Sequence, residues 1–428
     1  MSKIQVEVRF TDKLESIRVG GQDMEIPNAI KTKSVEEWFE PAAGRVNWDG
    51  LGAEIKAMDF SDEKNAVYSF QFNGPEDKKQ EFMKCVRDHG LGEEAQQETQ
   101  EETEQDYLQD ASDFQQVGNA EMAFQKYMVA ASEYGRPDAQ LEVARCYQNG
   151  TGVEKNEENA VVWYKKAAEQ GYAEAQKKLG DCYNYGTGVA KDLEQAFECY
   201  RKAAEQGNAR AQNNLGVCYM NGNGVTKDPV QAAEWYARAA EQGLARAQYN
   251  LGYCYKTGEG VEKDPKKAAM WCEKAAEQGI AVAQNSIGYC YDTGFGVEKD
   301  TSKAVFWYRK AAEQGNVGAQ YKLGKCYYYG KGTEKDNEEA VKWFRKAAEQ
   351  GDADAQYKLG LFYENGYGVA QNKEEAVKWY RKSAEQGCAR AQCRLGWFYK
   401  NGYGVTQNKE EAVKWYRKSA EQGVAAAQ

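Results

Sequence analysis

Apolar residues follow two different patterns along the chain, and the pattern changes near residue 100. Before that point, segments such as IQVEVRF and AVYSFQF alternate apolar with polar residues, as half-buried β-strands do. After it, apolar residues lie three and four positions apart, which places them on one face of an α-helix. The pattern therefore predicts a short N-terminal part with strands and a long helical part.

The helical part repeats itself every 36 residues. The dipeptide Ala-Gln recurs at this spacing from Ala139 to Ala427, and a closing glycine recurs from Gly135 to Gly423 without any insertion. A fixed period of this length indicates an array of repeats that share one continuous core. We assign eight complete repeats to residues 136–423 and the start of a truncated ninth repeat to residues 424–428.

Each repeat contains two predicted helices. The first opens at the Ala of Ala-Gln and stops at a Gly-x-Gly turn. The second follows an Asp or Asn, such as Asp192, that can cap its first turn, and it ends at Glu-Gln-Gly. A glycine such as Gly216 stands in the middle of the first helix, where it costs about 1 kcal/mol relative to Ala. We expect this cost to be offset by close packing of the second helix's Trp, here Trp235.

The repeat unit AQxxLGxxYxxGxGVxKDxxxAxxWYxKAAEQG resembles the Sel-one-like repeat (SLR) family, a relative of the tetratricopeptide repeat. The resemblance covers Arg136 to Gln428. It implies an α/α superhelix, that is, an α-solenoid of helix-turn-helix repeats. It also implies a scaffold or adaptor for protein complexes, often in signalling, with no chemistry of its own.

Residues 1–92 have a ββαββα pattern, with helices expected at 34–42 and 75–89, and this predicts a small α+β domain. Residues 93–106 contain seven acidic residues and no basic one, which is typical of a solvated acidic linker or an exposed helix. An acidic interaction tail is the less favoured alternative, and we assign the segment as a linker. Residues 107–135 are helical again and lead in phase into the first repeat, so we expect a capping helix pair there. The predicted fold class is thus mainly α, a solenoid preceded by an α+β domain.

The charge and the cysteines favour a cytoplasmic protein. The formal net charge is −10, which argues against nucleic acid or an anionic membrane as partner, and no apolar segment is long enough for membrane insertion. Six of the 11 cysteines occupy one repeat position, where the last two repeats have Phe362 and Phe398. Exchange with Phe indicates a buried apolar site. The family's secreted, cysteine-rich branch pairs cysteines across each helix pair, and that pattern is absent here.

The sequence contains no constellation typical of an enzyme. His89 is the only histidine, near the end of a predicted helix, and no cysteine pair has metal-binding spacing. The Gly-x-Gly turns follow helices and not strands, so they do not match a phosphate-binding loop. We therefore expect no catalytic residue, no cofactor and no metal ion.

The candidate binding surface consists of the positions two, six and nine residues after the Ala of Ala-Gln. These positions share one face of the first helix, and their residues differ from repeat to repeat. By analogy with tetratricopeptide arrays, we expect the face to line a concave groove that binds a protein or peptide. The predicted contact residues are Asn213, Tyr249, Tyr253, Tyr289, Tyr321, Lys325, Tyr357 and Trp397. The alternative is that these tyrosines pack against the next repeat.

Three further alternatives stay open. The N-terminal domain can be the enzymatic or sensing module, with the repeats as its localiser. The family's cysteine-rich branch suggests binding or hydrolysis of β-lactams or peptidoglycan fragments. Finally, the helix that carries Val413, Trp415 and Tyr416 has no following repeat to cover it. Either the chain is cut from a longer one or this helix makes an end-to-end contact, and we favour truncation.

Overall fold

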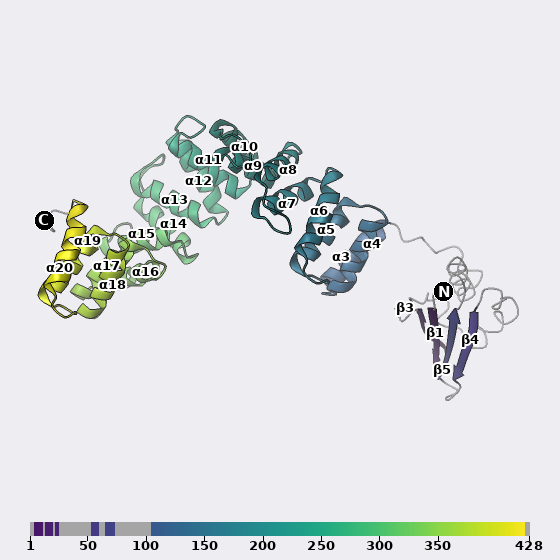
Figure 1. Cartoon of the computed structure of the whole chain (residues 1–428). Helices are drawn as coiled ribbons and strands as arrows, with labels where there is room; N and C mark the ends of the chain where they lie inside the picture. The colour runs from purple at the N-terminus through teal and green to yellow at the C-terminus, as the bar shows by residue number, and fades with distance from the viewer. Residues whose placement is uncertain are drawn as a thin grey trace. The chain divides into compact units, whose positions relative to one another are not determined.

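The computed structural model describes five strands between residues 4 and 72 and the chain from residue 104 to 423 (Figure 1). The chain forms two units, Met1–Thr103 and Glu104–Gln428, which we describe separately. The segments at 34–42, 75–92 and 424–428 lie outside the described residues, as does His89. The predictions made for them remain predictions.

The described part of the first unit is an antiparallel sheet with strand order β3-β2-β1-β5-β4. Its strands are β1 (Ile4–Thr11), β2 (Lys13–Val19), β3 (Gln22–Met24), β4 (Ala53–Asp59) and β5 (Asn65–Phe72). The central strand β1 pairs with β2 and β5, so that Val8 lies opposite Ile17 on one side and Tyr68 on the other. The alternating segments of the sequence thus form four of these strands. The α+β class of this unit stays a prediction.

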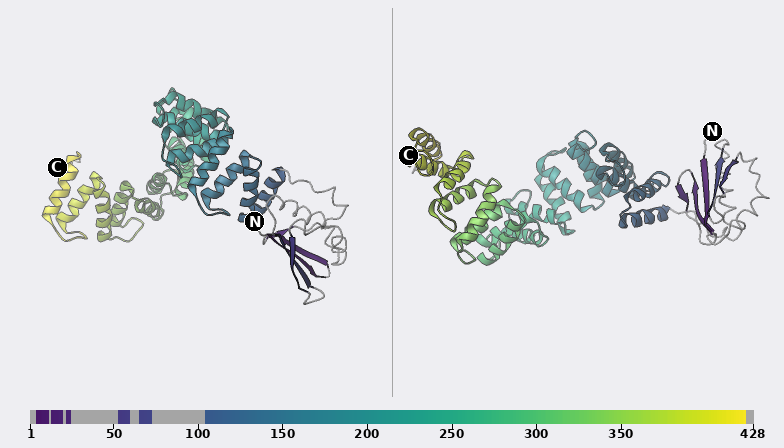
Figure 2. Two further views of the ribbon diagram at one scale, coloured as in Figure 1. Left: turned by 45° about the vertical axis from the view of Figure 1, so that its right-hand side comes forward. Right: turned by 90° about the horizontal axis from the view of Figure 1, so that it is seen from below.

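The described part of the second unit consists of helices of 13 residues, and each packs against the helix before it and the helix after it (Figures 1 and 2). The first two are α3 (Glu104–Gln116) and α4 (Ala120–Ser132). The first helices of the repeats are α5 (Pro137–Asn149), α7 (Ala173–Tyr185), α9 (Ala209–Asn221), α11 (Ala245–Thr257), α13 (Ala281–Thr293), α15 (Val317–Tyr329), α17 (Ala353–Asn365) and α19 (Ala389–Asn401). The second helices are α6 (Glu157–Glu169), α8 (Leu193–Glu205), α10 (Pro229–Glu241), α12 (Pro265–Glu277), α14 (Thr301–Glu313), α16 (Asn337–Glu349), α18 (Lys373–Glu385) and α20 (Lys409–Glu421).

Two helix boundaries differ from those expected. Helix α3 begins at Glu104, inside the segment 93–106 expected to be a linker, because Ala111 and Phe114 of this helix pack in one cluster with residues of α4. The first helices begin two residues before the Ala of Ala-Gln. In α9 the side chain of Asn208 accepts a hydrogen bond from the backbone N–H of Ala211, so the helix already starts there. The second helices begin as expected, with Asp192 capping the N–H of Gln195 in α8.

The second glycine of each Gly-x-Gly turn allows close contact with the backbone of the preceding repeat. Gly296 has a φ of 75°, which favours glycine, and a Cβ placed on it would lie 1.8 Å from the carbonyl oxygen of Pro265. Gly188 lies in the same way on the carbonyl of Glu157. The turn of one repeat therefore rests on the first turn of the preceding repeat's second helix, and only glycine fits.

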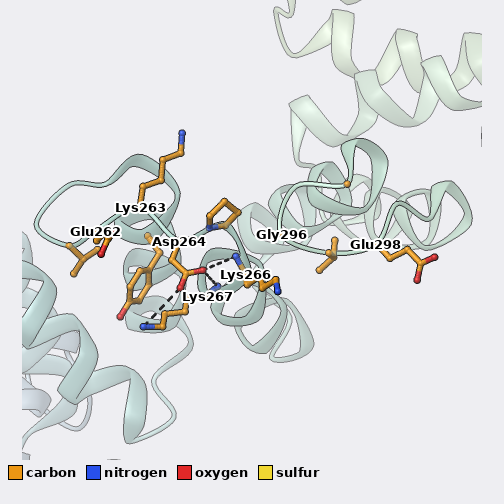
Figure 3. Close-up of a pocket in the computed structure, with 12 residues that line it drawn as sticks. Glu262, Lys263, Asp264, Lys266, Lys267, Gly296 and Glu298 are labelled. Carbon is orange, nitrogen blue, oxygen red and sulfur yellow. Dashed lines mark hydrogen bonds and ion pairs between the residues drawn. The ribbon is translucent and has the colours of Figure 1, made fainter.

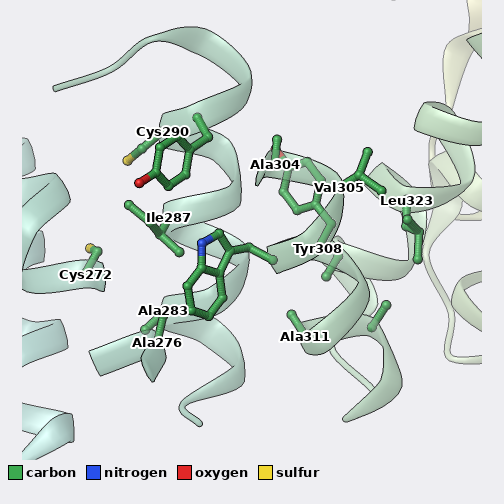
Figure 4. Close-up of a cluster of buried hydrophobic side chains, with 14 of the residues drawn as sticks. Cys272, Ala276, Ala283, Ile287, Cys290, Ala304, Val305, Tyr308, Ala311 and Leu323 are labelled. Carbon is green, nitrogen blue, oxygen red and sulfur yellow. The ribbon is translucent and has the colours of Figure 1, made fainter. Parts of the chain in front are cut away.

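The repeats share a core of small and aromatic residues (Figure 4). Around α13 it contains Ile287, Cys290 and Tyr308, each less than 4% exposed. The described cysteines carry no disulfide. The cysteine position of the first helix is buried as predicted, with Cys146 alone half-buried, and the aromatic replacements Phe362 and Phe398 are buried too. The interpretation of this position as an apolar core site is confirmed.

Six of the seven mid-helix glycines pack against a tyrosine or phenylalanine of the second helix, not against the tryptophan, and Gly252 packs against Cys272 at the same position. A Cβ on Gly216 would lie 2.7 Å from the ring of Tyr236, and one on Gly324 would lie 2.8 Å from the ring of Phe344. The expected contact with Trp235 is therefore wrong. Neighbouring residues of a helix point about 100° apart, so only one of the two rings can face the glycine. The tryptophan lies under a basic side chain instead, as Arg238 lies 4.3 Å from the ring centroid of Trp235.

Paired glutamines link each repeat to the one before it. The buried Gln284 donates from Nε2 to the carbonyl of Ala276 in the preceding repeat (3.1 Å). Its Oε1 accepts from Nε2 of Gln314, at the end of its own second helix (2.8 Å). The same pair joins the two helices of every repeat at 2.7–2.9 Å: Gln140–Gln170, Gln176–Gln206, Gln212–Gln242, Gln248–Gln278, Gln284–Gln314, Gln320–Gln350, Gln356–Gln386 and Gln392–Gln422. This ladder explains why the Gln of Ala-Gln and the Gln of Glu-Gln-Gly both recur.

Helix α15 contains two glycines that test the close packing directly. We expect Gly324→Ala to lower the free energy of unfolding by about 1–3 kcal/mol, because the added methyl group meets the Phe344 ring. Gly318→Ala is the matched control, since its Cβ meets atoms no closer than 3.6 Å and Ala favours the helix. Urea unfolding monitored by circular dichroism measures both. A Gly324→Ala protein as stable as the Gly318→Ala protein would contradict the packing.

The buried thiols predict a loss of stability at alkaline pH. Burial raises the pKa of Cys218 and Cys254 from 9.0 to about 11. The unfolded chain therefore releases these protons first, so stability is complete below pH 9 and falls as the pH rises through 11. We expect the urea midpoint to fall between these pH values, and to fall less when both cysteines are replaced by Val. A midpoint that does not change with pH in this range would contradict the burial argument.

Candidate protein-binding surface

Side chains connect consecutive first helices along one face of the array. Nδ2 of Asn214 in α9 lies 3.4 Å from Oδ1 of Asp181 in α7, and Arg390 in α19 pairs with Asp354 in α17 at 2.7 Å. We call positions two, six and nine of these helices the first-helix stripe. The stripe contains all eight residues predicted to contact a partner, but the structure gives them three different environments.

The tyrosines at position two of the stripe are half-buried. Tyr321 packs against Phe344 with ring centroids 5.8 Å apart, and burial raises its pKa to about 12. Tyr357 packs against Tyr380 at 5.9 Å, and burial raises its pKa as well. Tyr249 contacts the core around α13, and burial is again the main cause of its raised pKa. These three rings have a structural role in addition to any role in binding.

Position six carries the exposed residues among the eight predicted contacts. The exposed fractions are 46% for Tyr253, 38% for Tyr289 and 37% for Trp397. Lys325 is also exposed, and its Nζ lies 5.5 Å from the ring centroid of Tyr321. Large exposed aromatic rings on one face are typical of interaction surfaces. The structure therefore leaves these four predicted residues accessible to a partner.

Asn213 is not an accessible polar anchor. It is only 3% exposed, and its Oδ1 accepts a hydrogen bond from Nδ2 of Asn250 in the next first helix (2.9 Å). The amide is thus used to join α9 to α11, and this part of the prediction is wrong. An amide at position two can bond to position three of the following repeat, which periodicity alone did not reveal.

Two lysines flank Tyr289 from neighbouring repeats. The Nζ of Lys256 lies 5.2 Å from the Tyr289 ring centroid, and the Nζ of Lys322 lies 5.1 Å from it. In the described part of the chain, neither of these lysines nor Lys325 has a carboxylate partner within 4.0 Å. Burial and the charge of Lys256 lower the pKa of Lys322. Unpaired cations thus lie beside an exposed ring, although the whole chain is acidic.

A second aromatic group, in the last three repeats, includes residues that the sequence reasoning missed. Tyr403 lies 4.9 Å from Trp397 between ring centroids, and Tyr367 lies 6.3 Å from Tyr328. Tyr367 and Tyr403 are the middle residues of their Gly-x-Gly turns and are 41% and 36% exposed. The signal was present in the sequence, because this middle position varies from repeat to repeat in the same way as the stripe.

A depression of about 930 Å³ lies outside the stripe (Figure 3). It is lined by the start of α12, by Lys263 and Asp264, and by the turn at Gly294 and Gly296. Asp264 caps the backbone N–H groups of Lys266 and Lys267 there. Equivalent depressions of about 800 and 570 Å³ occur at the start of α6 and at the start of α4. This hollow therefore arises from the repeat geometry.

Within the described residues, no group of three or more His, Cys, Asp or Glu side chains is arranged to hold a metal ion. Of the helices described, none has the length and apolar character needed to cross a membrane.

The helix pairs form an α-solenoid, and the residues on its first-helix face vary from repeat to repeat. Comparison with known proteins shows the family to which the chain belongs. The chain belongs to the Sel1 repeat family, as its resemblance to Sel-one-like repeats predicted. The family model matches eight consecutive segments: 137–172, 173–208, 209–244, 245–280, 281–316, 317–352, 353–388 and 389–424. These repeats, numbered one to eight below, begin one residue later than we expected. No curated protein sequence matched the chain.

Two of the solved structures similar to the chain are crystal structures of repeat proteins. One is c5321, a protective antigen present in uropathogenic Escherichia coli strains that displays an SLR fold, with 42% identity and a TM-score of 0.67. That match covers 71% of this chain and 65% of the other, so it spans less than two thirds of that protein. The other is a Sel1 repeat protein from Oxalobacter formigenes, with 32% identity, a TM-score of 0.54 and coverage of 74% and 91%.

Proposed function

We propose that the chain is a non-enzymatic scaffold or adaptor whose first-helix stripe binds a partner protein or peptide. The observation that carries the proposal is the exposure of Tyr253, Tyr289 and Trp397 on a single face of the array. Rigid aromatic side chains bury a large area with little loss of conformational entropy, so they dominate many interfaces. Lys325 and the half-buried Tyr249, Tyr321 and Tyr357 extend this surface.

The Sel1 repeat solenoid supports the general role, because solenoids of this kind present long binding surfaces. The cytoplasmic location expected from the sequence is part of the proposal, and fractionation of the source cells tests it. Signalling as the pathway and an end-to-end contact of the last helix stay predictions.

Affinity capture from the source-cell lysate tests the proposed surface. We expect the variant Tyr253→Ser, Tyr289→Ser, Trp397→Ser to capture at least about tenfold less of a partner than the unchanged chain does. The reason is that the exposed rings carry the binding energy. Quantitative mass spectrometry compares the variant with the unchanged chain. Circular dichroism checks that the variant is folded, which we expect because the three side chains are exposed.

A matched control removes exposed apolar side chains from second helices. Met270 in α12 and Phe306 in α14 are 42% and 51% exposed, close to the stripe residues in exposure. We expect the variant Met270→Ser, Phe306→Ser to capture the same partners as the unchanged chain. Equal capture by all three proteins would contradict the proposal and direct attention to the N-terminal unit.

A further inference from the structure

The tyrosine that packs on the mid-helix glycine sends its hydroxyl toward the first-helix stripe. Tyr164 donates to Oε1 of Gln148 at position nine (2.8 Å). Tyr200 donates to Oδ1 of Asp181 at position six (2.9 Å). In each of these repeats, the hydroxyl finds an acceptor on the stripe of its own repeat.

Repeat seven shows how a carboxylate completes this arrangement. Glu364 at position nine accepts the hydrogen bond from the hydroxyl of Tyr380. The same carboxylate lies 3.5 Å from Nη1 of Arg394 in the following repeat. The hydroxyl and the cation therefore meet at one carboxylate.

The equivalent hydroxyl and cation occur 72 residues earlier, as Tyr308 in repeat five and Lys322 in repeat six. The Nζ of Lys322 lies 5.2 Å from the Tyr308 ring centroid. In place of Glu364, repeat five has the shorter Asp292, whose carboxylate pairs with Lys331 instead. The hydroxyl of Tyr308 is buried and has no hydrogen-bond partner among the described residues. Burying a hydroxyl without a partner is unfavourable, so a carboxylate that displaces the atoms covering this hydroxyl would gain a hydrogen bond from it.

A second cation and an exposed ring lie at the same place. Lys256 and Lys322 flank the ring of Tyr289, and Lys256 is close enough to lower the pKa of Lys322. A bound carboxylate would relieve the repulsion between these ammonium groups and accept charge-assisted hydrogen bonds from them. The unpaired hydroxyl and the unpaired cations are thus both stabilised by the same kind of ligand group, a carboxylate.

We propose that Lys256, Tyr308 and Lys322 bind a carboxylate side chain from an acidic segment of the partner, while Tyr289 packs against the adjacent part of that segment. This inference rests on the proposed function, and it names the chemistry of the partner. Glu364 in repeat seven is the internal example of the ligand.

Fluorescence anisotropy with fluorescein-labelled hexaglutamate tests the inference on the full chain at low ionic strength. We expect the unchanged chain to bind the probe and the variant Lys256→Gln, Lys322→Gln to bind it about tenfold more weakly. The control variant Lys263→Gln, Lys266→Gln removes two exposed lysines outside the stripe and should change the affinity less than about twofold. No binding by the unchanged chain, or equal weakening in both variants, would overturn the proposal.

Asp292→Glu tests the comparison with repeat seven without removing a lysine. The longer side chain should supply the carboxylate from within the chain, so we expect weaker hexaglutamate binding and a higher midpoint of thermal unfolding. Unchanged affinity would overturn the comparison on which the proposal depends. A hexaphosphoserine peptide tests whether the site binds a phosphate group in place of a carboxylate. Binding of that peptide alone, lost in Lys256→Gln, Lys322→Gln, would overturn the assignment to a carboxylate.

The failure of this inference can be told from the failure of the proposed function. If hexaglutamate does not bind but partner capture still depends on Tyr253, Tyr289 and Trp397, the stripe is the binding surface and its ligand is not acidic. If hexaglutamate binds through Lys256 and Lys322 but capture does not depend on those aromatic residues, the proposed function is wrong.

Discussion

The buried glutamine of Ala-Gln fixes the position of each repeat on the one before it. Gln284 bonds to a carbonyl of the preceding second helix and to Gln314 of its own second helix, so it joins three helices. A buried amide tolerates little displacement, because losing one such partner costs about 1–3 kcal/mol. The repeated turn glycines and the glycine–tyrosine contacts then allow the helices to approach as closely as this bonding requires.

The same constraint separates the core from the functional surface. Because each repeat stacks in the same way, equivalent positions of the first helices stay in one stripe, and a substitution there changes the surface but not the fold. Repeats five and seven illustrate this, since Asp292 and Glu364 differ by one methylene. The hydroxyl of Tyr380 donates a hydrogen bond to Glu364, whereas that of Tyr308 has no partner among the described residues. A regular scaffold can therefore carry an irregular binding surface.

The sequence predicted the features that depend on local chemistry or on the 36-residue period, such as the cap at Asp192 and the buried cysteine position. It did not predict which of two adjacent rings faces Gly216, because both Trp235 and Tyr236 fit the apolar pattern. It also placed Asn213 on the surface, although a contact with Asn250 of the next repeat buries it. Such contacts depend on the stacking between repeats, which a pattern within one repeat does not determine.

Photo-crosslinking from single positions tests most directly whether the first-helix face meets the partner. Benzoylphenylalanine replaces Tyr289 in α13 in one protein and Phe306 in α14 in another, two exposed positions on different helices of one repeat. We predict crosslinks to a partner from position 289 and none from position 306 after irradiation in the source cells. Crosslinks from position 306 alone would contradict the assignment of the first-helix stripe as the binding surface.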